Sequence, residues 1–132
     1  MGDHVRMSTS GRLKAALAMV PGLEGMVLSP AARERLDAVV DLVVTTAVAG
    51  PVDVPAEAAA SVEVLVTGWG CPALDAGALA HLPALRLVAH AAGTVRPLVT
   101  DALWERGVVV TSAAAANAVP VAEFTFAVII MA

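Results

Sequence analysis

Residues 62–93 read VEVLVTGWGCPALDAGALAHLPALRLVAHAAG and contain two apolar runs separated by a segment of helical pattern. The first run, Val62–Thr67, ends at a Gly-Trp-Gly turn, and the second, Leu85–Ala89, is followed by a further glycine turn. Between them, Asp75 is a suitable N-cap and Pro83 ends the helix that this cap would open. Strands joined by a helix of about ten residues pair in parallel through a right-handed crossover. The stretch therefore predicts a β-α-β unit.

The same alternation of short apolar runs and helical segments extends to both sides of this unit. Further strands are expected over Leu13–Val20, Leu42–Thr46 and Val108–Thr111. One helix is expected to open at Ser29-Pro30, because serine is a good N-cap and proline fits the first turn. Another is expected over Pro97–Arg106 with Gly107 as its C-cap, and a last one from within Ala113–Val119 to the end. The predicted fold is a flavodoxin-like, doubly wound α/β sheet of about five parallel strands that ends in a long apolar helix.

Composition limits both the class of the protein and its partners. The chain has 132 residues, 58% hydrophobic and 15% charged, which suits one folded domain and excludes disorder. A net charge of −4 supplies no basic face, so no nucleic acid partner is expected. The single Cys71 excludes an internal disulfide framework and a cysteine-rich zinc site, and the three histidines form no metal set. We therefore expect a cytoplasmic protein without a metal site.

Neither end of the chain is expected to be a targeting or membrane segment. Residues 1–20 place basic side chains ahead of a short apolar run, but no small-residue cleavage site follows. Residues Val119–Ala132 are more apolar, yet they contain Pro120, Glu123 and Thr125 and fall short of the ~18–20 residues that span a bilayer. No membrane partner is expected.

Candidate binding residues follow the predicted strands. In an open parallel sheet, ligands bind beyond the carboxyl ends of the strands, which directs attention to residues 68–71, 90–95 and 112–117. Glycines there let backbone amides approach an anion, although a plain tight turn has the same sequence. No stretch carries three spaced glycines or a P-loop. His90 and Cys71 each stand alone, and such residues are more often structural than functional.

Three groups of residues in the second half of the chain combine into one pattern. They are Pro83-Ala84-Leu85-Arg86-Leu87-Val88 followed by Ala92-Gly93-Thr94, then Trp104-Glu105-Arg106-Gly107-Val108-Val109-Val110-Thr111-Ser112, then Asn117 with Val121-Ala122-Glu123. Each group is weak alone, but the combination is specific. In this order, the stretch Val62–Ala132 resembles the N-terminal, substrate-binding part of the D-isomer-specific 2-hydroxyacid dehydrogenases.

The resemblance implies an oxidoreductase in which a short 2-hydroxy or 2-oxo acid binds between two domains, beside NAD or NADP. The smaller domain of this family offers backbone amides at strand exits to the substrate carboxylate. The positions that match are Ala92, Gly93 and Thr94, with Trp69 and Gly70 on the neighbouring exit as weaker candidates. Asn117, at the start of the segment that matches the interdomain helix, is a weak candidate for cofactor binding.

The resemblance also implies that part of the enzyme is absent from this chain. The catalytic Arg, Glu and His of the family and its glycine-rich loop lie downstream, so no catalytic residue is expected here and the chain alone is expected to be inactive. We expect a disordered start over residues 1–10, a substrate-binding domain over 11–112 and the start of an interdomain helix over 113–132. Because Val119–Ala132 is apolar on all sides, it should dock on the missing dinucleotide domain or on a second subunit.

The alternative is a non-catalytic module of the same fold that binds a small anion or another chain. An in-frame continuation beyond Ala132 with a glycine fingerprint, then Arg, Glu and His, would favour the enzyme. A genuine stop codon and a stable, soluble product of this length would favour the module.

Overall fold

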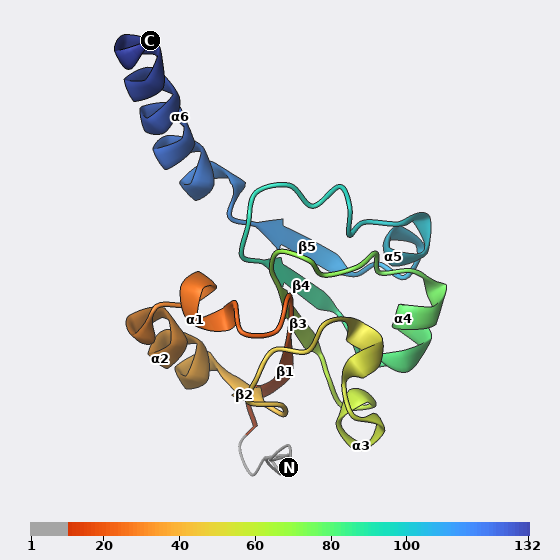
Figure 1. Ribbon diagram of the computed structural model, residues 1–132. Coiled ribbons are helices and arrows are strands. Elements are labelled where there is room, and N and C mark those ends of the chain that lie inside the picture. Colours follow the sequence, from red (N-terminus) through yellow and green to blue (C-terminus); the bar gives the residue numbers. More distant parts are fainter. Residues whose placement is uncertain (1–10) are drawn as a thin grey trace.

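The computed structural model describes residues 11–132, so the disorder predicted for residues 1–10 lies outside the described residues (Figure 1). Five strands form one sheet in the order β2-β1-β3-β4-β5, and every neighbouring pair is parallel. Their bounds are β1 Leu13–Ala18, β2 Val40–Leu42, β3 Val64–Thr67, β4 Leu87–His90 and β5 Val109–Ser112. The predicted flavodoxin-like sheet is confirmed.

The helices alternate with the strands along the chain. Their bounds are α1 Glu24–Val27, α2 Pro30–Val39, the 3₁₀ helix η1 Pro51–Asp53, α3 Ala56–Ala59, α4 Ala76–His81, α5 Asp101–Glu105 and α6 Ala114–Met131. Two of the predicted caps are present: the Ser29 hydroxyl accepts from the N–H of Ala32 at 3.2 Å, and Asp75 accepts from the N–H of Ala78 at 2.9 Å. These bonds satisfy N–H groups that have no partner within the helix.

The helices cover the two faces of the sheet unequally. On one face, α3, α4 and α5 form a core in which Leu79 and Leu103 join Leu65 of the central strand (Figure 1). On the other face, α1 and α2 form a smaller core in which Leu36 joins Leu17. Successive residues of a strand point to opposite faces, so β1, β3 and β4 contribute to both cores. Helices on both faces of the sheet are typical of parallel strands.

The β4–β5 side of the second face is only partly covered. Leu87 and Ala89 of β4 are half-buried, and Val109, which pairs with Leu87, is 58% exposed. Thr111, which pairs with Ala89, is also exposed. An apolar strip of sheet therefore faces outward beside α2.

The second strand differs from the prediction over Leu42–Thr46. The observed β2 starts two residues earlier because α2 runs directly into it: Val40 still donates to the carbonyl of Leu36 and already pairs with Leu13. Pairing with β1, rather than the centre of the apolar run, decides which residues form the strand.

The helix expected over Pro97–Arg106 is also shorter. It begins at Asp101, because the hydroxyl of Thr100 accepts from the N–H of Leu103 at 3.3 Å and acts as the cap. The short α1 was not predicted.

Helix α6 extends away from the sheet, as Figure 1 shows. All of its residues are exposed, and its large exposed side chains are Val119, Val121, Phe124, Phe126, Val128, Ile129, Ile130 and Met131. The helix has 18 residues, so by length and composition it could cross a membrane. This corrects the length argument made from the shorter run Val119–Ala132, but core helices of soluble proteins pass the same test. The absence of a membrane partner stays a prediction.

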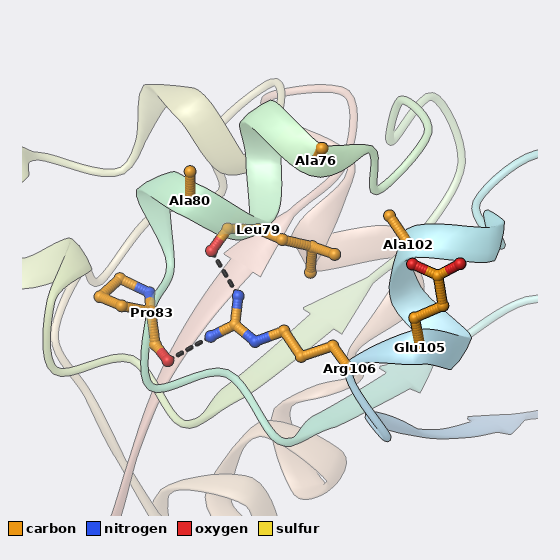
Figure 2. Close-up of a pocket in the computed structure, with 7 residues that line it drawn as sticks. All are labelled: Ala76, Leu79, Ala80, Pro83, Ala102, Glu105 and Arg106. Carbon is orange, nitrogen blue, oxygen red and sulfur yellow. Dashed lines mark hydrogen bonds between the residues drawn. The ribbon is translucent and has the colours of Figure 1, made fainter.

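Arg106 joins the end of α5 to the end of α4. Its guanidinium donates to the carbonyl oxygens of Leu79, Leu82 (2.9 Å) and Pro83, as Figure 2 shows for the first and last. The last carbonyl groups of a helix have no N–H partner within the helix. A side chain that donates to several of them therefore stabilises the end of α4. Gly107 follows at φ +72° and ends α5, as predicted from its position.

Replacing this guanidinium should destabilise the domain. We expect Arg106→Met to lower the free energy of unfolding by about 1–3 kcal/mol, since bonds from a charged donor to partly buried carbonyls are lost. Urea denaturation measures the change. Arg35→Met is the matched control, because Arg35 lies on the exposed side of α2 and should change stability by less than about 0.5 kcal/mol. Equal losses in both variants would contradict the role given to Arg106.

Candidate functional site

The carboxyl ends of three neighbouring strands meet at one edge of the sheet. The register aligns Thr67, His90 and Ser112, which are the last residues of β3, β4 and β5. The segments 68–71, 90–95 and 112–117 therefore leave the sheet side by side. This edge is where open parallel sheets bind ligands.

The turn after β4 leaves several backbone donors free. Among the described residues, the N–H groups of Ala92, Gly93 and Thr94 have no hydrogen-bond acceptor. The N–H of Ala91, just before them, donates to the carbonyl of Thr67 at 2.8 Å and ties the turn to the sheet. Ala92 is 6% exposed, whereas Thr94 is exposed. Consecutive free N–H groups of this kind form a concavity that attracts anions.

The start of α6 lies against the same turn. The N–H of Ala113 donates to the carbonyls of His90 (3.0 Å) and Ala92 (3.1 Å). A Cβ placed on Gly93 would lie 3.2 Å from Nδ2 of Asn117. The structure thus brings together Gly93 and Asn117, two of the residues that the sequence predicted for the site.

The other predicted turn, at Trp69 and Gly70, faces a different strand exit. The carbonyl of Trp69 accepts from the N–H of Val20 at 2.8 Å, just beyond β1. Gly70 has φ +82°, and a Cβ there would overlap the side chain of Val20. Glycine is therefore needed for the turn itself. The N–H groups of Trp69 and Gly70 also have no acceptor in the described part of the chain, but this turn packs toward β1 and not toward α6.

The residues after β3 do not form a dinucleotide site. Residues 68–73 read GWGCPA, which has the spacing of the nicotinamide-dinucleotide fingerprint with alanine in its third position. In that fingerprint the pyrophosphate lies at the N-terminus of a helix that opens within the turn. Here α4 begins only at Ala76, and Val20 occupies the space beside Gly70. These residues do not fit a pyrophosphate group.

His90 is buried between strand and turn. Its side chain is 6% exposed, and its Nδ1 lies 2.9 Å from Oγ1 of Thr67, which is fully buried in β3. Burial lowers the pKa of His90, and a hydrogen bond with the backbone of Thr94 acts in the opposite direction. The ring is therefore neutral near pH 7. Sequence reasoning considered His90 alone and missed Thr67, although both end apolar strands.

The remaining candidates are structural. Burial raises the pKa of Cys71 to about 12, so its thiol is not reactive near neutral pH. Nε2 of His81 lies 2.7 Å from the carbonyl oxygen of Val54 and links α4 to the loop after η1. Within residues 11–132, no group of three or more His, Cys, Asp or Glu side chains is arranged to hold a metal ion.

Of two cavities in the surface, one adjoins the candidate site. A groove of about 510 Å³ between α4 and α5 is lined by Ala76, Leu79, Ala80, Pro83, Ala102, Glu105 and Arg106 (Figure 2). It lies toward the amino ends of β4 and β5, and the guanidinium of Arg106 is already bonded to carbonyls. A smaller cavity of about 280 Å³ adjoins the strand exits, with Ala89, His90, Thr111 and Ser112 in its wall. The smaller cavity is the one beside the candidate site.

The lowered pKa of His90 predicts a pH-dependent stability. Its unfolded-state pKa is near 6.5 and its folded-state pKa is lower, so the unfolded chain binds a proton first as pH falls. The free energy of unfolding should therefore decrease from about pH 6.5 down to the folded-state pKa and then level off. Urea denaturation at about pH 7.5 and 5.5 measures this, with His90→Asn as the reference that cannot titrate. Equal pH dependence in both proteins would contradict the prediction.

The family model described as D-isomer specific 2-hydroxyacid dehydrogenase, catalytic domain, matches residues 23–128. The match extends into the first half of the chain, whereas the resemblance found from the sequence pattern covered only Val62–Ala132. No curated protein sequence matches the chain closely enough to count as a relative.

Several solved structures share the fold. A D-lactate dehydrogenase from Aquifex aeolicus, crystallised with NAD and lactic acid, is 21% identical with a TM-score of 0.63, over 88% of this chain and 32% of that chain. The pyruvate reductase of Chlamydomonas reinhardtii is 20% identical with a TM-score of 0.57, over 78% of this chain and 29% of that one. A phosphoglycerate oxidoreductase from Rhizobium etli is 24% identical with a TM-score of 0.63, over 89% and 36%.

The chain thus spans about a third of the length of these structures. At 20–24% identity, these structures establish only the fold of the chain. The match to the family model establishes its family. Since that model covers well over half of the chain, the protein belongs to the D-isomer specific 2-hydroxyacid dehydrogenases and carries their catalytic domain.

Proposed function

We propose that this chain is the substrate-binding half of an oxidoreductase that transfers a hydride between NAD(P) and a 2-hydroxy or 2-oxo acid. The observation that carries the proposal is the turn after β4, where Ala92, Gly93 and Thr94 present consecutive N–H groups without a protein acceptor in the described chain. Membership of the family and the lactic acid bound to a relative of the same fold support it.

The turn suits a carboxylate better than a neutral ligand. Hydrogen bonds from backbone N–H groups to an ionised acceptor are shorter and stronger than those to a neutral one. Arg96, two residues after the turn, is exposed, and its guanidinium has no hydrogen-bond partner in the described chain. Its charge attracts an anion to this edge of the sheet.

The cofactor is proposed to bind mainly to a dinucleotide domain outside this chain, because the glycine turn after β3 does not fit a pyrophosphate. Asn117 is the side chain proposed to reach the cofactor, since its amide lies beside Gly93. Helix α6, exposed along its whole length, is proposed to dock on that domain or on a second subunit.

A bulky side chain at Gly93 should weaken substrate binding in a protein that carries both domains. Gly93→Val would block the approach to the free N–H groups and press on Asn117, so the KM for pyruvate should rise at least about tenfold. Steady-state kinetics measure the change. Gly25→Val is the matched control, because a Cβ at Gly25 has nothing within 4 Å and lies on α1. If KM and kcat stay unchanged in Gly93→Val, the turn does not bind the substrate.

The isolated chain of 132 residues should associate with itself and remain inactive. The exposed apolar side chains of α6 favour association, and the glycine turn after β3, the one described stretch with the dinucleotide spacing, does not fit a pyrophosphate. Light scattering should give a mass above 13.3 kDa, and titration with NAD should give no binding signal. Phe126→Lys should shift the mass toward the monomer. A monomer that binds NAD would contradict the proposal on both points.

A further inference from the structure

We propose that the free edge of β5 is an interface with a second copy of this chain. The two β5 strands pair in antiparallel fashion across a two-fold axis and join two five-stranded sheets into one continuous sheet. The interface does not involve the turn 92–94, so it does not depend on the function proposed above.

The fold covers the two edges of its sheet unequally. β2 forms one edge, and its three residues are only 5% to 8% exposed. β5 forms the other edge, and three of its four residues are exposed. Val109 at its start is 58% exposed. The position of a strand at an edge therefore does not by itself explain the exposure of β5. Within the described chain, β5 is the edge that stays open.

The outer side of β5 presents backbone groups without partners. On the inner side, the N–H of Val109 donates to the carbonyl of Arg86, just before β4, at 3.0 Å. The backbone groups of a strand alternate in direction with a period of two, so those of Val110 and Ser112 point away from β4. Neither N–H has a hydrogen-bond acceptor in residues 11–132. Such an edge is a template for a further strand.

These open groups are complementary to themselves. In an antiparallel pair centred on Thr111, Val110 lies opposite the partner's Ser112, and Ser112 lies opposite the partner's Val110. Each of these residue pairs exchanges two N–H···O=C bonds, so both open N–H groups of each strand are satisfied. Side chains of Thr111 and the partner's Thr111 meet at the axis, which is a favourable cross-strand pair. A two-fold contact uses the same patch on both copies and closes at a dimer.

The sequence of this edge contains nothing that keeps a second copy away. Natural edge strands are commonly protected by lysine, proline or a β-bulge. β5 contains neither residue, and its pairing with β4 is uninterrupted. Residues 107–122 carry no charged side chain, although the chain has a net charge of −4. Since that charge makes two copies repel each other, an uncharged edge favours contact at this place over contact elsewhere.

Helix α6 lies on the same side of the molecule as this edge. It begins two residues after β5 ends and extends past β5, away from β2 (Figure 1). A second copy that continues the sheet at β5 therefore offers a surface to the exposed apolar side chains of α6, such as Phe124 and Ile129. Covering those side chains adds to the stability of the pair.

Disulfide formation at the two-fold axis tests the proposed register. The only cysteine, Cys71, is buried, so an introduced thiol reports on its own position. Thr111 and the partner's Thr111 form a pair without hydrogen bonds, in which the Cα atoms are about 4.5 Å apart. That separation allows a disulfide. We expect Thr111→Cys in the 132-residue chain to give a covalent dimer after mild oxidation with diamide, measured on a non-reducing gel.

Val109→Cys is the matched control. Val109 lies on the same strand and the same face of the sheet, and it is also exposed. It lies opposite the partner's Ala113, so the two introduced thiols are offset by four residues, or about 13 Å. We expect little covalent dimer from this variant. No dimer from Thr111→Cys, or equal amounts from both variants, overturns the proposal.

Light scattering gives an independent measurement of the same interface. Phe126→Lys serves as the background, because it weakens association through α6. In this background we expect a mass of twice 13.3 kDa, which Thr111→Lys should reduce to 13.3 kDa by placing two like charges at the axis. Thr46→Lys makes the same charge change at an exposed threonine outside β5 and should leave the mass unchanged. A background that is already monomeric contradicts pairing through β5.

The other occupant to distinguish is a segment of a longer chain. Thr111→Cys is therefore also oxidised in a protein that carries both domains. A covalent dimer there supports the proposal. If the covalent dimer forms only in the 132-residue chain, another segment covers the edge in the longer protein and the proposal is wrong.

Discussion

The structure depends on the in-register parallel pairing of β1, β3 and β4. The residues of β1 and β3 are almost completely buried, so a shift of one residue would move apolar side chains out of both cores. The same register places Thr67, His90 and Ser112 at one edge of the sheet. The hydrogen bond between Thr67 and His90 and the side-by-side exit of the three segments follow from it.

The two glycine turns at this edge differ in what holds them. The turn at Gly70 is fixed by its close contact with Val20. Glycine is needed there because the backbone has a positive φ and a Cβ would overlap Val20. In the turn at Gly93, the carbonyl of Ala92 accepts from the N–H of Ala113, and the N–H groups of Ala92, Gly93 and Thr94 have no acceptor in the described chain. Similar sequence patterns therefore give one turn that packs tightly against Val20 and one that lies beside the start of α6.

Burial is uneven across the molecule. The side covered by α3, α4 and α5 is closed, and Arg106 locks the ends of two of these helices together. The opposite side leaves Val109 exposed, and α6 buries none of its apolar residues. The chain also spans only about a third of the solved structures that share its fold. Helix α6 and the candidate binding turn both leave the carboxyl end of the sheet, where Ala113 joins β5 to α6.

The sequence alone determined the alternation of helices and strands, the caps at Ser29 and Asp75, and the candidate turn at Gly93, because period, capping and turn chemistry are local properties. It did not place β2 correctly, since pairing with β1 sets the limits of that strand. It also missed the bond between Thr67 and His90, which are 23 positions apart and meet only through the register. Which N–H groups remain free was likewise a tertiary outcome, because it depends on every acceptor that the fold brings near them.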